Sequence, residues 1–443
     1  MGFLNIFGKS KKEKEAEEAA LEEEKVKRHE ELVEEQKKAH EGFQWPVMPR
    51  INQMNVKRPD NDAAAPVVIE DPLTEEEKSR VGNLIYEPEL KPSDLKKLNL
   101  QELLFLEAAI NLAQAQAKLQ NFEENRQAIH TEFLNTIRRS ENYYLLYDNR
   151  TGYPLIDNEF VQLYLDEEHA KKGAALYQQQ YRAIRIMQFP GMFAPQDPEK
   201  PQALGLFDVL YFLGDENIIV DNGYYKGFLK RSEISAPFYI NKDPKTIPPH
   251  NPALVFAIND YLCEFKWPVN YPTRQELLKK RFDRILAFMS KAIFLVPAKV
   301  EEVTPDATAN GDTSGNAGAA MTGSTAAEGT AAQAPRKSVE VPGLNVGGKR
   351  FLPVFTDVFE FIKAFKDTEF RPNSLNYQNV LAMAAKYDGF IINPKGQGLV
   401  MQRQEQPAAA PSEAGTTETV VSRPHLVKDA TSESGNESGD PEK

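Results

Sequence analysis

Hydrophobic and polar positions change period abruptly within residues 349–361, KRFLPVFTDVFEF. Residues 350–355 form a short apolar run with aromatic and β-branched members, which is typical of a buried strand. After Asp357, apolar side chains recur at i, i+3, i+4 and i+7, the spacing of one helix face. These side chains are Val358, Phe361, Ile362 and Phe365. The pattern therefore predicts a strand that leads into a helix with almost no loop.

The same order of patterns occurs twice along the chain. Residues 143–223 read as strand, strand, helix, strand, helix and strand, and residues 291–402 repeat that order. The segments LYLDEEHA and PVFTDVFE correspond, as do NIIVDNG and FIINPKG, which indicates a duplicated module. We therefore predict the α/β (α+β) class, with two small β-β-α-β-α-β modules and an α-helical connector between them.

The remaining patterns set the expected boundaries. Lys and Glu recur three and four residues apart over 9–41, which predicts a solvated helix outside the folded core. Segments rich in Ala, Gly, Thr and Ser bury too little apolar surface to order, and we expect them to be disordered. The predicted regions are a charged N-terminal helix (1–42), a linker (43–92), a long helix (93–142), the first module (143–240), a helical connector (241–290), the second module (291–402) with a disordered insert (301–348), and a disordered tail (403–443).

Short signals refine this organisation. Capping-box spacing marks three helix starts, at Asn99–Glu102, Thr273–Glu276 and Asp357–Glu360. The apolar segment FQWPVMPRI lies inside the predicted linker. Because exposed apolar patches are uncommon on monomers, we expect this segment to dock on the protein itself rather than on a partner.

Composition narrows the function classes. The chain has 443 residues and a formal net charge of −12, which argues against general nucleic-acid binding because phosphate affinity depends on Lys and Arg. Cys263 is the one cysteine, so no intramolecular disulfide forms, and we expect it to be buried. No apolar run has the length of a bilayer span. A reducing cytoplasm fits these features best.

Three short motifs indicate a family. The strand residues Phe294–Pro297, the segment LPVFTD (352–357) and the segment GFIINP (389–394) follow in that order. With them, residues 285–402 resemble the N-terminal domain of the SseB family, named for enhanced serine sensitivity. The chain departs from that family in the stretch of some fifty residues between its first two strands, and the family's C-terminal domain is not evident. The resemblance implies a bacterial, cytoplasmic protein with no established reaction.

The motif residues have structural interpretations first. Phe355 is expected in the core, Asp357 as a helix cap, and Asn393–Pro394 as the end of a strand. A ligand role for Asn393 is the alternative, because functional residues favour loops at element ends. The motif residues carried over are Leu352, Pro353, Phe355, Thr356, Asp357, Asn393 and Pro394.

No reactive constellation is evident elsewhere. Glycine-rich phosphate loops and nucleophile elbows are missing from the sequence, and no two histidines have metal-ligand spacing. We therefore predict no catalytic residue, cofactor or metal ligand. An apolar patch followed by lysines is a candidate for peripheral membrane contact. Its residues are Phe3, Leu4, Ile6 and Phe7.

These observations favour a non-enzymatic bacterial protein that acts as a protein-binding or scaffold module, with a protein partner of unknown identity. The charged arm, the insert and the tail suit an interaction protein. The alternative is an enzyme, or a sensor for a small amino-acid-like molecule, with its site between the two modules, because pockets favour domain interfaces.

Overall fold

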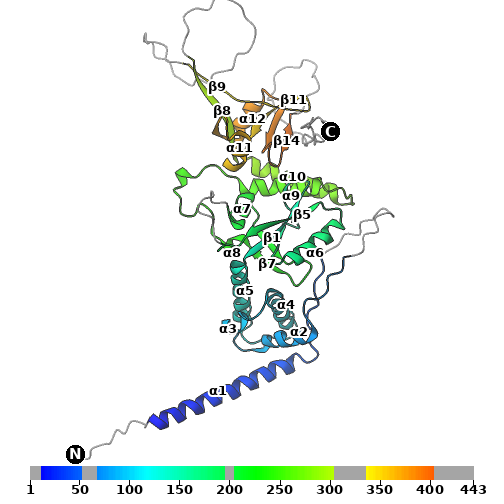
Figure 1. The fold of residues 1–443 in the computed structure, drawn as a ribbon, viewed down its shortest axis with the longest axis vertical. Helices are drawn as coiled ribbons and strands as arrows, with labels where there is room; N and C mark the ends of the chain where they lie inside the picture. The colour runs from blue at the N-terminus through cyan, green and yellow to red at the C-terminus, as the bar shows by residue number, and fades with distance from the viewer. Residues whose placement is uncertain (1–10, 52–66, 195–203, 304–335, 404–443) are drawn as a thin grey trace, which may run out of the picture. The chain divides into compact units, whose positions relative to one another are not determined.

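The computed structural model describes residues 11–51, 67–194, 204–303 and 336–403 (Figure 1). It divides into two compact units. Unit 1 takes in the chain up to Pro237, except residues 150–152 and 211–214, which group with unit 2. The predicted membrane-contact patch, nearly all of the tail and most of the insert lie outside the described residues.

Unit 1 begins with a set of helices. Their bounds are α1 (Lys11–Ala39), α2 (Glu75–Gly82), η1 (Asn83–Tyr86), α3 (Pro92–Leu95), α4 (Leu100–Gln116) and α5 (Phe122–Arg139). The capping box at Asn99 and Glu102 is confirmed. The single helix predicted over 93–142 is wrong, because the chain leaves the helix at Ala117 and turns through Asn121, whose φ is +49°. The predicted linker contains α2 and η1, which bury Val81 and Ile85 completely.

The C-terminal end of α1 packs on the folded unit, contrary to the predicted solvated arm. The Gln36 side chain donates to the Tyr86 carbonyl at 2.9 Å and accepts from the Gln120 N–H at 2.9 Å. His40 is buried, with its Nε2 3.0 Å from the Ala113 carbonyl oxygen. The pattern of charged and apolar residues did not predict these contacts, because the side chains that make them, Gln36 and His40, are polar.

Docking of the FQWPVMPRI segment on the protein itself is confirmed. The Trp45 ring lies 6.0 Å from the Phe105 ring of α4, and it sits against Gly82, where a Cβ atom would meet the indole at 2.5 Å. Ile51 joins a buried cluster with α6. The segment therefore covers α4 and the sheet of unit 1.

The sheet of unit 1 follows these helices. Its elements are β1 (Asn142–Asp148), β2 (Tyr153–Pro154), β3 (Ile156–Asp157), β4 (Phe160–Tyr164), α6 (Glu167–Gln178), β5 (Ile184–Pro190), α7 (Leu206–Leu213), β6 (Asn217–Val220), β7 (Gly227–Lys230) and α8 (Arg231–Ile234). The main strand order is β5-β1-β4-β6-β7, in which only β4 and β6 are parallel. A Cβ atom on Gly227 would meet Phe133 and Leu104, so α4 and α5 cover one face. Helix α6 covers the other face, where Ala170 and Ala174 pack with Leu146 and Tyr164.

Unit 2 contains η2 (Pro244–Thr246), α9 (Pro252–Phe265), α10 (Arg274–Met289), β8 (Ile293–Val303), β9 (Arg336–Glu340), β10 (Leu344–Val346), β11 (Lys349–Val354), α11 (Val358–Phe365), β12 (Arg371–Asn376), α12 (Tyr377–Ala384), β13 (Gly389–Ile392) and β14 (Leu399–Gln402). One sheet has the order β10-β11-β13-β14 and the other β12-β8-β9. Leu295 and Phe355 join them through two backbone hydrogen bonds of 2.9 Å. The order across this junction is therefore β12-β8-β11-β13-β14, with β11 and β13 parallel.

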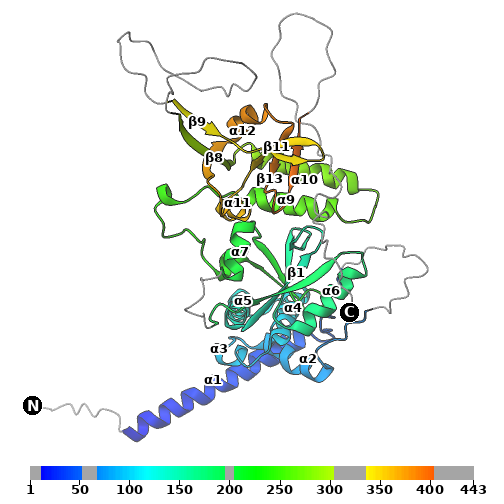
Figure 2. The same cartoon turned by 45° about the horizontal axis from the view of Figure 1, so that its top comes forward.

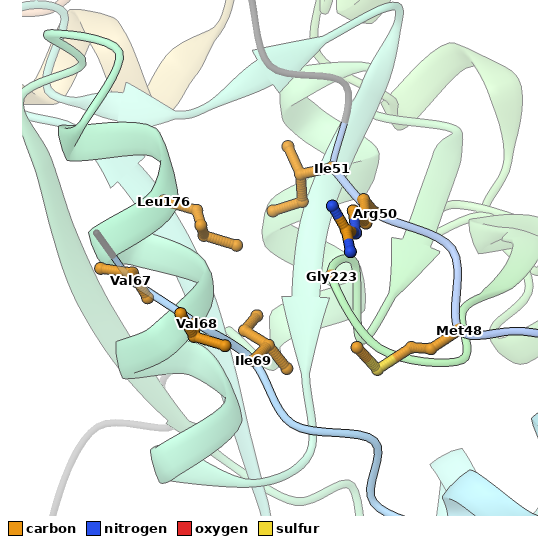
Figure 3. A pocket seen from close by; sticks show the side chains of 8 residues that line it. All are labelled: Met48, Arg50, Ile51, Val67, Val68, Ile69, Leu176 and Gly223. Carbon is orange, nitrogen blue, oxygen red and sulfur yellow. The ribbon is translucent and has the colours of Figure 1, made fainter.

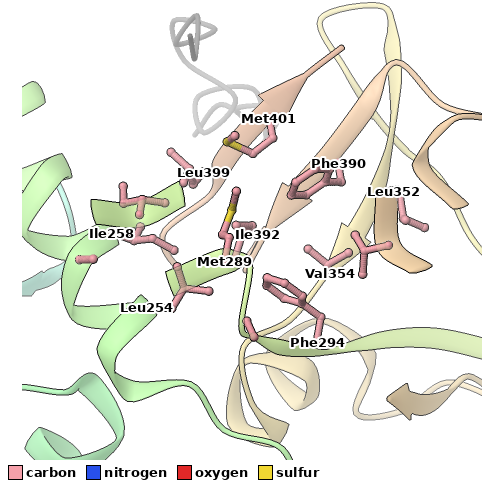
Figure 4. Close-up of a cluster of buried hydrophobic side chains, with 14 of the residues drawn as sticks. Leu254, Ile258, Met289, Phe294, Leu352, Val354, Phe390, Ile392, Leu399 and Met401 are labelled. Carbon is pink, nitrogen blue, oxygen red and sulfur yellow. The ribbon is translucent and has the colours of Figure 1, made fainter. Parts of the chain in front are cut away.

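The core of unit 2 shows that α9 and α10 are more than a connector. Leu254 and Ile258 of α9 and Met289 of α10 are buried against β8, β11, β13 and β14 (Figure 4). Helix α11 packs on the opposite face, where Phe361 contacts Phe355. The two helices therefore supply one of the layers that enclose this sheet.

Local details of unit 2 also differ from prediction. The predicted insert over 301–348 is too wide, since β8 continues to Val303 and residues 336–346 contain β9 and β10. The capping box at Thr273 is wrong, because this side chain makes no cap hydrogen bond. Asp357 caps α11 by accepting from the Glu360 N–H at 3.0 Å.

The packing of α1 generates a stability prediction. Deleting residues 1–42 removes the partners of Tyr86, Ala113 and Gln120, which we expect to cost about 2 kcal/mol and to lower the melting temperature by about 4–8 °C. Deleting only residues 1–28 leaves Gln36 and His40 in place, and we expect almost no change. Differential scanning calorimetry of both truncations checks this, and equal melting temperatures would show that the end of α1 adds nothing to unit 1.

Candidate functional site

The motif residues of unit 2 lie around the carboxyl ends of the parallel strands β11 and β13. Leu352 faces the core under α9 and α10, while Phe355 lies in the cluster under α11. Pro353 pairs with Ile391 on β13, and Thr356 and Asp357 follow β11 directly. Asn393 and Pro394 follow β13. The structure therefore gathers the motif at one edge of one sheet.

Asn393 links the two strand ends. Its Oδ1 accepts from the Thr356 N–H at 3.0 Å, and its Nδ2 donates to the Thr356 hydroxyl at 2.8 Å and to Gln397 Oε1 at 2.7 Å. The Thr356 hydroxyl donates in turn to Asp357 Oδ2 at 2.8 Å. The backbone N–H of Asn393 donates to the Val354 carbonyl at 2.9 Å, and the φ of Asn393 is +49°, a conformation that Asn tolerates better than most residues.

This network accounts for the motif without a ligand. Thr356 and Asn393 are fully buried, and Asp357 is 6% exposed. Their polar atoms bind one another, because a buried polar group that lacks a hydrogen bond is costly. The polar residues of the motif therefore fix the geometry of the strand ends, and the side chains of Thr356, Asp357 and Asn393 are all buried.

The matching edge of unit 1 has different chemistry. Asp221 follows the parallel strand β6 with a φ of +53°, and its N–H donates to the Leu163 carbonyl at 2.9 Å. Its Oδ2 lies 3.0 Å from Nδ1 of His169 and accepts from Gln101 Nε2 at 2.8 Å. Gln101 also receives the Tyr225 N–H at 3.1 Å. The buried carboxylate of Asp221 thus contacts both the imidazole of His169, which is 23% exposed, and the side-chain amide of Gln101 on α4.

Aromatic side chains enclose this carboxylate. The Tyr224 ring stacks on His169, with their centroids 3.9 Å apart. Burial, and then the charge of Asp221, raises the pKa of Tyr224 to about 12, so its hydroxyl keeps its proton at neutral pH. Among the described residues, three buried atoms of the β6–β7 loop have no hydrogen-bond partner. They are Asp221 Oδ1, Asn222 Oδ1 and Tyr224 Oη.

A cavity of about 340 Å³ opens beside the same loop (Figure 3). Aliphatic side chains from the segments before and after residues 52–66 form most of its wall, together with Leu176 of α6 and Gly223. Arg50 is the charged residue among those that line it. The lining residues are Met48, Arg50, Ile51, Val67, Val68, Ile69, Leu176 and Gly223.

Strand β5 ends the sheet of unit 1, and in the described part of the chain it pairs only with β1. At the two ends of this pair, Asn149 N–H donates to Ala183 O and Gly191 N–H donates to Glu141 O, both at 2.7 Å. Antiparallel pairs alternate, so Ile186 and Gln188 direct their backbone N–H and C=O groups outward. The residues that follow β5 expose apolar side chains, and that of Phe193 is 77% exposed.

Strand β12 ends the sheet of unit 2, and its edge is blunted. Pro372 lies opposite Pro297 of β8. Neither proline has an N–H, so their pair is not hydrogen-bonded, and the nitrogen of Pro372 faces the outer edge. Proline on an edge prevents another strand from adding there.

The sequence motifs did not predict the groups of unit 1. His169 has no metal-ligand partner in sequence, and Asp221 carries no motif of its own. The similarity of NIIVDNG to FIINPKG was the available signal, although it sets Asp221 opposite Pro394, one residue from the position of Asn393 that the strand registers give it. In the described part of the chain, no group of three or more His, Cys, Asp or Glu residues is arranged to hold a metal ion. No described helix combines the length and apolarity that crossing a membrane requires.

The network in unit 2 is open to a mutational test. Asn393→Ala leaves the Thr356 N–H and Gln397 without partners and strains a left-handed backbone, so we expect a loss of about 2–4 kcal/mol of unfolding free energy. Asn393→Gly relieves the strain alone and should lose less. Urea unfolding measures both against Asn345→Ala, an exposed control on β10. A loss equal to that of the control would contradict the structural role.

Comparison with known protein families finds a match within unit 2. Residues 275–405 match the family model of the SseB protein N-terminal domain. No curated protein and no solved structure matches the chain. The matched segment includes most of α10, β8 to β14 and all the motif residues. The resemblance predicted for residues 285–402 is therefore confirmed for this segment of the chain.

Proposed function

We propose that this chain is a non-enzymatic bacterial protein that binds other proteins in the cytoplasm. In this proposal it contains two copies of one α/β module, and the outer edge of β5 receives an extended segment of the partner. The open edge of β5 is the observation that carries the proposal. The SseB-type domain in unit 2 supports it more weakly, since its polar motif is occupied internally.

Strand registers support the two copies. On the parallel pairs, Leu163 lies opposite Val220 in unit 1 and Val354 opposite Ile392 in unit 2. On the next pairs, Val220 lies opposite Gly227 and Ile392 opposite Leu399. The loops between these strands are therefore equal in length, and each begins with a left-handed residue, Asp221 or Asn393.

The helices before each sheet extend the correspondence. Helices α4 and α5 precede β1 and cover the face that contains Gly227. Helices α9 and α10 precede β8 and cover the equivalent face of the second sheet. We infer that the repeated module includes this helix pair and reads α-α-β-β-α-β-α-β-β.

The difference between the two edge strands supports a binding role for β5 in unit 1 and not for β12 in unit 2. An edge with free backbone groups is a template for an added strand, and main-chain hydrogen bonds provide affinity in such complexes. Strand β5 offers Ile186 and Gln188 to a partner and carries its proline, Pro190, only at its last residue, whereas Pro372 is the second residue of β12. Between residues 181 and 194 the charged side chains are Arg182 and Arg185, so an apolar partner strand with acidic residues complements this edge.

A photo-crosslinking amino acid at Gln188, used in the native cell, tests this function. We expect it to capture a defined partner, and adding Ile186→Pro should abolish the capture by removing an outward N–H while the pairing with β1 remains. The matched control places Ser374→Pro on β12 and should leave capture unchanged. Capture that persists in the Ile186→Pro protein, or no capture above that of a probe on β12, would refute strand addition at β5.

Small-molecule binding is a second candidate function, and the cavity beside Arg50 favours it. A pocket with mostly apolar walls and few polar groups is the usual form of a ligand site. All of its lining residues belong to unit 1.

A further inference from the structure

We propose that the cavity beside Gly223 binds an aliphatic molecule with an anionic head group. The aliphatic body lies against Ile51, Ile69 and Leu176, and the anion binds the guanidinium of Arg50. This site is independent of strand addition at β5.

The cavity depends on a glycine. Gly223 has a φ of +108°, a conformation that other residues rarely adopt. A Cβ atom there would lie 3.0 Å from Ile69 Cδ1 and 3.4 Å from Ile51 Cδ1, so a longer side chain would enter the cavity. The loop follows the parallel strand β6, and the carboxyl ends of such strands are where α/β sheets place ligands. The cavity therefore lies where a ligand site is expected.

The walls suit an aliphatic body. Ile51 and Leu176 belong to the buried cluster under α6, and Val67 and Ile69 pack against it. These branched side chains provide apolar contact from several directions, as Figure 3 shows. The volume of about 340 Å³ is near the lower limit for ligand pockets, which indicates a small molecule. Burial of its methylene groups would supply most of the affinity, because apolar surface gains free energy on leaving water.

Arg50 determines the charge of the head group. Its guanidinium lies between Ile51 and Gly223 in Figure 3, and the described residues that line the cavity include no carboxylate. Arginine keeps its charge at all relevant pH values and binds carboxylate or phosphate through two parallel hydrogen bonds. Among the described residues, Arg50 makes no hydrogen bond or ion pair that would compete with a ligand. An anion is therefore the head group that this site recognises.

The equivalent edge of unit 2 is closed by its own side chains. By the strand registers, in which Val220 is equivalent to Ile392, Gly223 corresponds to Lys395, and the nearby Asn393 is bonded to Gln397. The same sheet edge thus carries an open cavity in one unit and an internal network in the other. The ligand site belongs to unit 1 alone.

Isothermal titration calorimetry of the full chain with octanoate, octyl phosphate, 1-octanol and octylamine tests the site. We expect octanoate or octyl phosphate to bind, and the tighter of the two identifies the head group. Arg50→Gln should weaken that binding at least tenfold, while Arg126→Gln, a surface arginine paired with Glu123, should leave it unchanged.

A second variant tests the cavity itself. Val68→Trp places a bulky ring at a lining position that is 71% exposed, so the fold should persist while binding is lost. Circular dichroism confirms folding of each variant. Failure of both anions to bind, equal binding of octylamine, or unchanged binding in Arg50→Gln would overturn the proposal, and none of these results bears on partner capture at β5.

Discussion

The residue that follows the inner parallel strand holds each sheet together at its carboxyl edge. Asp221 and Asn393 both turn the chain through a left-handed conformation, and both donate their N–H to the neighbouring parallel strand. In each parallel pair this residue pairs a carbonyl near the end of the neighbouring strand, so the strand ends without leaving that buried backbone group unpaired. The side chain then lies inside the protein, where it requires partners of its own.

The two units supply those partners in different ways. In unit 2 they come from the strand ends themselves, as Thr356 and Gln397 bind Asn393. In unit 1 they come from neighbouring helices, as His169 of α6 and Gln101 of α4 bind Asp221. Placing a carboxylate rather than an amide at this position demands donors, which an imidazole and an amide side chain provide. One exchange at a single position therefore draws two helices into the network.

Local patterns predicted much of this fold. The spacing of apolar and capping residues within a few positions of one another predicts several elements. They are the capping box at Asn99, the helices α9 and α11 and the strands β1, β4 and β11. Strands β7 and β14 escaped prediction, since each has only four residues and follows a turn. The break between α4 and α5 also escaped, because no glycine or proline marks it and Asn121 alone makes the turn. Short or weakly marked elements depend on tertiary contacts, which sequence periodicity does not express.

The candidate sites were harder to predict for the same reason. The cavity brings Arg50 and Ile69 together with Leu176 and Gly223, although long stretches of chain separate them. Each of these residues has an ordinary local explanation, as linker, helix face or turn. The motif of unit 2 could be recognised in the sequence because its residues follow two adjacent strands. Since its polar residues are buried and bond to one another, their role is structural. The sequence motif thus marks buried strand ends in unit 2, while the cavity of unit 1 forms where segments distant in sequence meet α6 and the β6–β7 loop.

The outer strands of the two sheets also differ from each other. Strands β5 and β12 occupy the same place in their sheets, next to β1 and β8. Pro372 removes an outward donor at the second residue of β12, and Pro190 removes one at the last residue of β5, which keeps donors at Ile186 and Gln188. An unprotected edge is an aggregation hazard, and proteins protect such edges with proline or charge. Arg185 gives β5 a charge, and the backbone groups of Ile186 and Gln188 remain directed outward. A charge and a proline at the last residue of β5 therefore protect this edge only in part, which agrees with the selective binding proposed for it.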